Sequence, residues 1–172
     1  SISSSSGATV ENNISLANGD ATFNQSGTAT YSGVISGSGN FIKAGLGTIT
    51  VSGANTYTGD TTLNAGTLTV SGTLSDSTDV IVNSGTTYDV NTNDTIQSLT
   101  GAGTIDIASA RTLTAGGDNG NESITGNFTG AGNFTKQGSG TYTLLGGSNS
   151  TSGLFTSSEG ELVFKGTFSG SP

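Results

Sequence analysis

The chain has 172 residues, including 29 Gly but only 1 Pro, and its net charge is −8. Because it contains no Cys and no His, its sequence excludes disulfides, Cys-based metal sites and nucleophilic catalysis by a Cys or a Ser–His pair. Its few cations are scattered, which argues against binding to nucleic acid, and no apolar run approaches the ~18 residues of a membrane-spanning segment.

Short runs in which apolar and polar residues alternate predict β-strands, and no window has a helical period. In chain order, the predicted strands are residues 29–31, 48–51, 67–70, 80–82, 104–107, 112–114, 141–144 and 162–164. Alternation directs one set of side chains inward and the other into solvent. For the two most regular runs, the predicted inward ladder consists of Ile49, Val51, Leu68 and Val70.

Short motifs recur along the chain. Residues 37–41 (GSGNF) return in related form as residues 101–105 (GAGTI) and 130–134 (GAGNF). Residues 47–53 (GTITVSG) return as 66–72 (GTLTVSG), so the register repeats after about 19 residues. Residues 37–53 also align without gaps with residues 130–146.

A step of about 19–20 residues corresponds to one turn of a β-solenoid. Gly and Asn suit its corners because they tolerate positive φ, and stacked turns bury the inner face that one turn cannot bury alone. The sequence therefore predicts an all-β, single-stranded parallel β-helix of about 8–9 turns, forming one domain over residues 1–172. A β-sandwich is a minor alternative, because hairpins do not give a returning register.

Residues 31–72 contain an ordered set of features: Gly37-x-Gly39, Lys43, Gly47-Thr48-x-Thr50, SGANTYTG at 52–59 and NAGTL at 64–68. With these features the segment resembles the autotransporter-associated β-strand repeat of bacterial passenger domains. Residues 124–166 resemble a diverged second copy, and residues 99–117 resemble only the front of the motif. The resemblance implies a right-handed β-helix at a bacterial cell surface without catalytic residues, and it leaves open whether the chain is an excerpt of a longer passenger.

We therefore predict a secreted or cell-surface bacterial protein without enzymatic activity, acting as a stalk or adhesin-type passenger module. Its partners would be host or cell-surface glycans or proteins. Two alternatives stay open. The unpaired strand edges at the ends of a solenoid suit end-to-end stacking of copies into a filament. The outward Thr-x-Thr pairs would suit binding to ice or glycans, although Thr is also a common residue on any exposed strand; these pairs include Thr48, Thr50, Thr67 and Thr69.

Few residues suggest chemistry. Asp118, Asn119, Asn121 and Glu122 resemble an oxygen-rich calcium loop but lack its full spacing, so a protruding polar loop is the favoured interpretation. Three carboxylate pairs are weak candidates for glycoside cleavage, since no aromatic or basic cluster accompanies them and the first two pairs are predicted to lie in turns: Asp76/Asp79, Asp89/Asp94 and Glu159/Glu161. No catalytic residue, metal or cofactor is predicted.

Repeated positions also give structural predictions. Asn64 and Asn83 occupy the same place in successive turns, which predicts a hydrogen-bonded Asn ladder. Lys43 and Lys136 occupy equivalent places in the two repeat copies and are interpreted as solvated corner residues.

Overall fold

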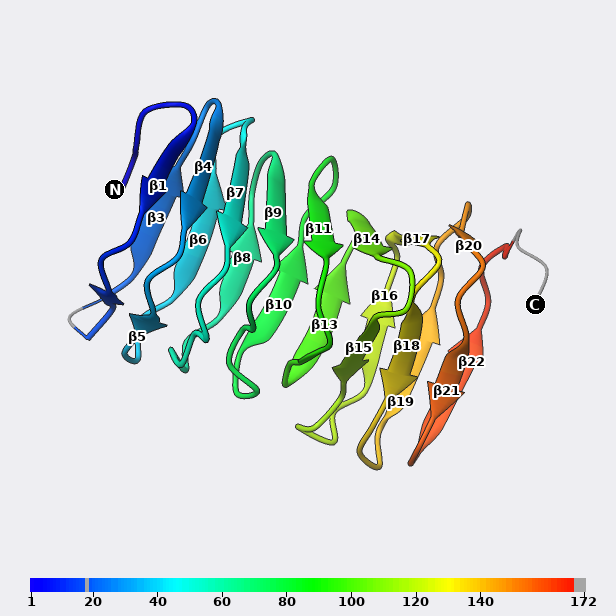
Figure 1. The fold of residues 1–172 in the computed structure, drawn as a ribbon. Helices are drawn as coiled ribbons and strands as arrows, with labels where there is room; N and C mark the ends of the chain where they lie inside the picture. The colour runs from blue at the N-terminus through cyan, green and yellow to red at the C-terminus, as the bar shows by residue number, and fades with distance from the viewer. Residues whose placement is uncertain (18, 169–172) are drawn as a thin grey trace.

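The computed structural model describes residues 1–17 and 19–168, and it shows a stack of eight coils (Figure 1). Every strand pairs in parallel with the strand of a neighbouring coil. Among the described residues there is no helix, and hence none long and apolar enough to cross a membrane. The predicted all-β parallel solenoid is confirmed.

Each coil has three faces, which we number in the order in which the chain passes them. Face 1 is an eight-stranded sheet of β1 (Ala8–Val10), β4 (Thr28–Tyr31), β7 (Thr48–Val51), β9 (Thr67–Val70), β11 (Thr87–Val90), β14 (Thr104–Ile107), β17 (Asn127–Gly130) and β20 (Ser150–Thr151). Face 2 holds two shorter sheets, one of β2 (Ile14–Ser15) and β5 (Ile35–Ser36), the other of β12 (Asp94–Thr95), β15 (Thr112–Ala115), β18 (Asn133–Lys136) and β21 (Phe155–Ser157). Face 3 is the second eight-stranded sheet, of β3 (Ala21–Asn24), β6 (Phe41–Ala44), β8 (Thr61–Leu63), β10 (Asp79–Val82), β13 (Ser98–Gly101), β16 (Glu122–Ile124), β19 (Thr141–Leu144) and β22 (Glu161–Phe164).

All eight predicted strands are present, and alternation is the reason that sequence alone could locate them. In β7 and β9, Ile49 pairs with Leu68 and Val51 with Val70, and all four side chains are buried. The segments that lack a firm repeat match, residues 1–30 and 73–98, form coils of the same kind. Coil length varies in the later part, where Thr104 pairs with both Thr87 and Asn127.

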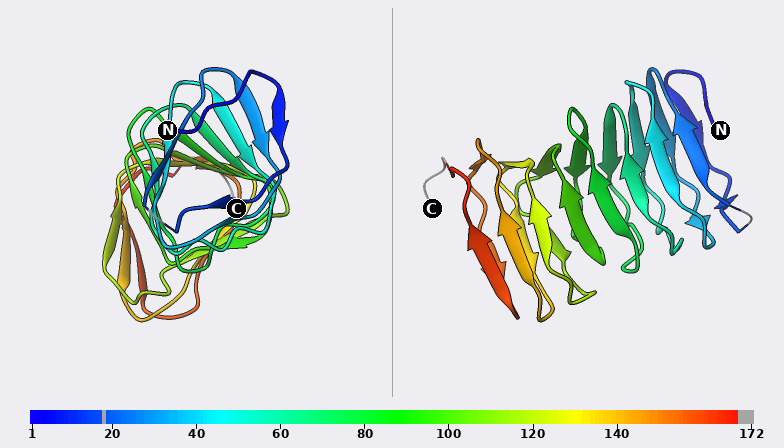
Figure 2. Two further views of the ribbon diagram at one scale, coloured as in Figure 1. Left: turned by 90° about the vertical axis from the view of Figure 1, so that its left-hand side faces the viewer. Right: turned by 180° about the vertical axis from the view of Figure 1, so that it is seen from behind.

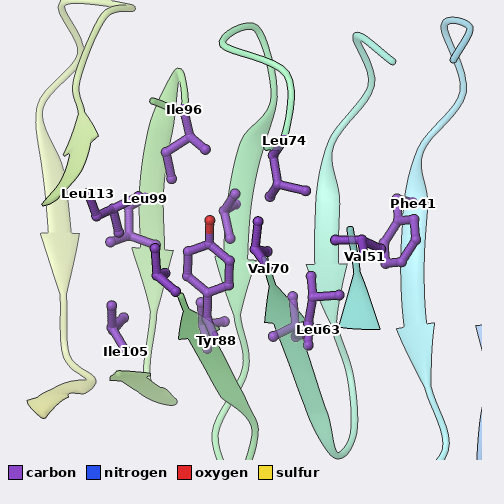
Figure 3. Close-up of a cluster of buried hydrophobic side chains, with 14 of the residues drawn as sticks. Phe41, Val51, Leu63, Val70, Leu74, Tyr88, Ile96, Leu99, Ile105 and Leu113 are labelled. Atoms are coloured by element: carbon purple, nitrogen blue, oxygen red, sulfur yellow. The ribbon is translucent and has the colours of Figure 1, made fainter. Parts of the chain in front are cut away.

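The core is a narrow column that runs through the stack. Viewed along the stack in the left panel of Figure 2, the coils enclose a small interior, and inward side chains from all three faces fill it. Figure 3 shows part of this column, with residues from successive coils in a row between Phe41 and Leu113. Aromatic rings add to the packing near the first coils, where Phe23 and Phe41 stack with their centroids 4.3 Å apart.

The repeated GxG motif forms a corner of the coil. Its first glycine has a positive φ in all three copies, 112° at Gly37, 121° at Gly101 and 84° at Gly130, a conformation that strains residues with a Cβ. The strand that follows lies on a different face each time: β6 on face 3, β14 on face 1 and β18 on face 2. The motif therefore specifies a corner but does not specify which corner.

Candidate functional site

Face 1 presents two outward columns of Thr side chains, which are partly or fully exposed. The first column comprises Thr28, Thr48, Thr67, Thr87 and Thr104, and the second comprises Thr9, Thr30, Thr50 and Thr69. Strands lie about 4.8 Å apart and alternate residues about 6.6 Å apart, so the hydroxyl and methyl groups form a regular grid. The second column ends at Asp89, whose carboxylate accepts a hydrogen bond of 2.8 Å from Thr69 Oγ1.

Asn64 and Asn83 lie on the outer side at the end of strands of face 3. Asn83 Nδ2 donates to Asn64 Oδ1 across 2.8 Å, which links two successive coils. Both side chains have access to solvent. This hydrogen bond joins two coils, so we interpret the Asn pair as structural.

The structure contradicts the interpretation of Lys43 as a solvated residue. Its side chain is 0% exposed and lies in the inward row of face 3, where it pairs with Phe23 on one side and Leu63 on the other. Its ammonium bends to the corner and donates to the carbonyls of Ala44 (3.1 Å), Gly45 (2.7 Å) and Ala65 (2.9 Å). Burial lowers the pKa of Lys43 to about 8.

Lys136 is buried in the same manner in the second repeat, so its predicted solvation is also wrong. It is 0% exposed on β18 of face 2. Its ammonium donates to the carbonyl of Gly138 and to that of Glu159 at 3.1 Å, and it lies 5.9 Å from the centroid of the Tyr142 ring. Each lysine thus joins the corner of its own coil to the corner of the next.

A signal for these buried lysines was present in the sequence. Lys43 lies two residues after Phe41, and Lys136 two residues after Phe134, so strand alternation directs each lysine to the side of its phenylalanine. Both phenylalanines are buried. The general expectation that Lys is exposed fails here because backbone carbonyls at the corner supply the polar partners that water would otherwise supply.

Two buried asparagines act as a second kind of connection between coils. Asn55 Oδ1 accepts the amide of Ile35 (3.0 Å), while its Nδ2 donates to the carbonyls of Gly53 (3.1 Å) and Thr73 (2.8 Å). We call such a residue a clamp, because one side chain takes backbone hydrogen bonds from coils on both sides.

Asn149 is the corresponding clamp near the second repeat. Its Oδ1 accepts the amide of Phe128 (2.7 Å), and its Nδ2 donates to the carbonyls of Gly146 (2.9 Å) and Thr167 (3.1 Å). Both amide functions of each Asn are used, which explains how these polar groups are tolerated inside the stack.

Asp94 occupies a place on face 2 similar to that of Asn55, but it carries a carboxyl group, which accepts from the coil before it and does not form a clamp as defined above. It is 4% exposed on β12, and both of its oxygens lie 3.2 Å from the amide of Leu74. The prediction that Asp89/Asp94 lie in turns is therefore wrong: Asp89 projects from β11, whereas Asp94 is buried on another face. Burial raises the pKa of Asp94 to about 7, although the amides of Leu74 and Thr95 oppose this shift.

The loop that resembled a calcium site connects β15 to β16. Asn119 Oδ1 accepts the amide of Ser139 (2.9 Å), and Asn121 Oδ1 accepts the amide of Thr141 (2.8 Å). Two of the four predicted ligand residues thus use their side-chain oxygens to hold the next coil.

The other two residues of that loop are acidic. Burial, together with the charges of Asp118 and Asp79, raises the pKa of Glu122. Within residues 1–17 and 19–168, no group of three or more His, Cys, Asp or Glu side chains is placed to hold a metal ion.

The remaining carboxylate pairs do not converge on a cleft. Asp76 lies in an exposed turn, while Asp79 begins β10 and accepts a hydrogen bond of 2.8 Å from Ser98 Oγ. Glu159 and Glu161 are exposed, and the part of Glu159 that makes a contact is its backbone carbonyl, which accepts from Lys136. The contacts of Asp79 and of the Glu159 backbone link neighbouring coils.

Comparison with known protein families assigns both lysine corners to the same kind of repeat. The passenger-associated-transport-repeat family matches residues 41–70, which contain Lys43, and residues 134–164, which contain Lys136. The chain carries two autotransporter passenger repeats. The resemblance inferred from sequence is thus confirmed, and so is a location outside or on the surface of a bacterial cell.

A curated relative contains the same kind of sequence. The chain is 39% identical over 144 residues to the "Adhesin BmaC autotransporter" of Brucella suis biovar 1 (strain 1330), an alignment that covers 78% of this chain and 4% of that protein. The passenger repeats described here therefore correspond to a small part of the length of that relative. No solved structure matches the chain significantly.

Proposed function

We propose that this chain is a non-enzymatic, adhesin-type passenger module that forms a stiff stretch of an extracellular stalk. The observation that carries the proposal is the unbroken parallel stack of eight coils, in which faces 1 and 3 run the whole length. Each coil is joined to the next by backbone hydrogen bonds and by a shared core, so bending requires the loss of both. The adhesin named as a relative supports the functional class.

The placement of the polar residues supports a role without catalysis. The lysines bind backbone carbonyls, the buried amides join coils, and the candidate carboxylates serve separate coils.

The stalk proposal is tested by measuring shape and adhesion. Small-angle X-ray scattering of the purified chain should show a stiff rod with eight coils at a spacing of about 4.8 Å, or about 4 nm in length. Bacteria that display the chain on a surface anchor should adhere to host cells more strongly than bacteria that display an unrelated solenoid of equal length. A flexible particle, equal adhesion, or polysaccharide turnover that is lost on carboxylate substitution would contradict the proposal.

The Thr columns of face 1 favour a second candidate function, binding of ice or of glycans by a flat hydroxyl surface. The in-register pairing of Thr48 with Thr67 and of Thr50 with Thr69 is the specific observation behind it. Thermal hysteresis and glycan-array binding should both be measured for the chain and for a Thr50→Lys, Thr69→Lys variant. Activity that the variant loses supports this candidate, whereas two blank measurements remove it.

End-to-end assembly is a further candidate, because the strand edges at the ends of a parallel solenoid suit the stacking of copies. Size-exclusion chromatography with electron microscopy decides the matter. Filaments that lengthen with concentration support assembly, and a persistent monomer rules it out.

A further inference from the structure

Two buried residues, Asn55 and Asp94, occupy similar places on face 2 but differ in their chemistry and in the coils that they contact. Asn55 and Asp94 each follow by 20 residues the backbone amide that they bind, and both are buried. Asn55 offers an acceptor and a donor, and both are used. Asp94 offers a donor only when its carboxyl group is protonated.

Burial makes the charged form of Asp94 costly. Transfer of an ionised carboxylate out of water is unfavourable unless cations or several donors compensate, and none of the interactions that act on Asp94 comes from a cation. The amides of Leu74 and Thr95 favour the charged form, but the effect of burial outweighs them.

The titratable neighbours of Asp94 do not reverse this balance. The hydroxyl of Tyr88 on β11 favours the charged form of Asp94, but its effect is smaller than that of burial, and Asp76 in the turn before β10 disfavours the charged form. The buried hydroxyl of Tyr88 has no partner of standard hydrogen-bond geometry. Figure 3 shows this hydroxyl pointing toward the part of the core where Leu74 and Ile96 lie.

We propose that the contact between the fourth and fifth coils on face 2 is an acid-stabilised seam, in which Asp94 is held as the neutral acid and its ionisation weakens the stack. A neutral Asp94 resembles the Asn55 clamp in shape and in its ability to donate. An ionised Asp94 places in the interior a charge that two backbone amides stabilise but that no cation balances. The seam makes this stretch of the solenoid more stable in mildly acidic surroundings than at neutral pH.

The direction of the pH effect follows from the two protonation states. The pKa of Asp94 is about 7 in the folded chain and 3.8 in an ordinary environment, so the folded chain binds more protons between these values. The free energy of unfolding therefore falls as pH rises from about 4 to about 7, and this contribution is constant above that range.

The test compares the intact chain with its Asp94→Asn variant by urea unfolding from pH 4 to pH 9. The advantage of the variant over the wild type should grow between pH 4 and pH 7, on the order of 100-fold in the unfolding equilibrium constant, and then level off. Because both proteins share all other titratable groups, this difference isolates Asp94. A difference that does not vary with pH, or a variant that is weaker at pH 8, overturns the proposal.

Two controls keep the test decisive. Asp106→Asn removes an equal charge from the outward side of β14 and should show no such growth with pH. Asn55→Asp introduces a carboxyl group into the Asn55 clamp and should create a second loss of stability over the same pH range.

A direct readout is independent of the variants. If Asp94→Asn does not fold, an NMR titration of the Asp94 carboxyl carbon in the unmodified chain gives the answer. A midpoint near neutrality supports the seam, and a midpoint below pH 5 overturns it.

Discussion

The two passenger repeats have similar sequences but begin on different faces of the solenoid. In the first repeat, Lys43 lies on β6 of face 3 and its ammonium reaches the corner that leads to face 1. In the second, Lys136 lies on β18 of face 2 and reaches the corner that leads to face 3. The buried lysine, the following glycine corner and the contact with the next coil are nevertheless the same.

The repeat therefore encodes a corner with its flanking strands, and this unit occupies two different corners of the coil, the one from face 3 to face 1 and the one from face 2 to face 3. The glycines after the lysines show why: Gly45 has φ 77° and Gly138 has φ 75°, and each lies against a backbone carbonyl of the preceding coil. Each corner needs a glycine with a positive φ and a buried lysine ammonium that donates to the backbone carbonyls around it. Both corners meet these requirements, because each coil stacks on a coil with the same backbone geometry.

The largest effect is expected from filling either glycine corner. Gly45→Val would force a β-branched residue to a positive φ and against the carbonyl of Gln25, and Gly138→Val would do so against that of Gly116. Each should lower the free energy of unfolding by about 2–4 kcal/mol, measured by urea unfolding followed by circular dichroism. Gly147→Ala is the control, because nothing lies within 4 Å of the added methyl group. Equal free energies of unfolding for all three variants would contradict the conclusion that both repeats need a glycine at this corner.

A smaller effect is expected when the buried ammonium of Lys43 or Lys136 is removed. Lys43→Met and Lys136→Met leave backbone carbonyls at the corners without their donor, which should cost about 1–3 kcal/mol each. The exposed Lys165 is the matched control, and Lys165→Met should change stability by less than about 0.5 kcal/mol. If one repeat tolerates the change and the other does not, the two corners are not equivalent.

The first corner should also make stability depend on pH. The pKa of Lys43 is about 8 when folded and 10.5 ordinarily, so the unfolded chain binds more protons between these values. Stability should therefore rise with pH from about 8 to about 10.5, by at most about 3 kcal/mol. The comparison is with Lys43→Arg, whose guanidinium stays charged throughout and should lack this rise. A parallel rise in both proteins would assign it to other groups.

The smallest effect is expected when one corner is exchanged for the other. Replacing residues 41–47 (FIKAGLG) with the sequence of residues 134–140 (FTKQGSG) keeps the inward Phe and Lys and changes only outward positions. The free energy of unfolding should change by less than about 1 kcal/mol. The same seven residues placed at 42–48 would direct Lys outward and should disrupt the fold. A large loss from the in-register exchange would show that the corners depend on their face.

The sequence was sufficient for elements in which composition and alternation agree. Thr48–Val51 and Thr67–Val70 combine inward aliphatic with outward Thr residues, so their bounds and their pairing partners follow from a motif that returns after one coil. Strands such as β8 and β12 were not predicted, because Thr61 and Asp94 are polar residues on the inward side. Their burial depends on partners that are remote in sequence, such as Thr78 for Thr61.

From its sequence alone, the chain could be assigned a parallel stack of coils, glycine corners and a repeat family, because these depend on local preferences that recur along the chain. Only the tertiary structure decided which face each repeat occupies and which polar side chains are buried. Lys43 and Asn55 each donate a hydrogen bond to a backbone carbonyl of the next coil, and Asp94 accepts one from a backbone amide of the preceding coil. Whether a polar residue is stable inside a solenoid depends on the carbonyls and amides of the coils beside it, and a local pattern does not contain that information.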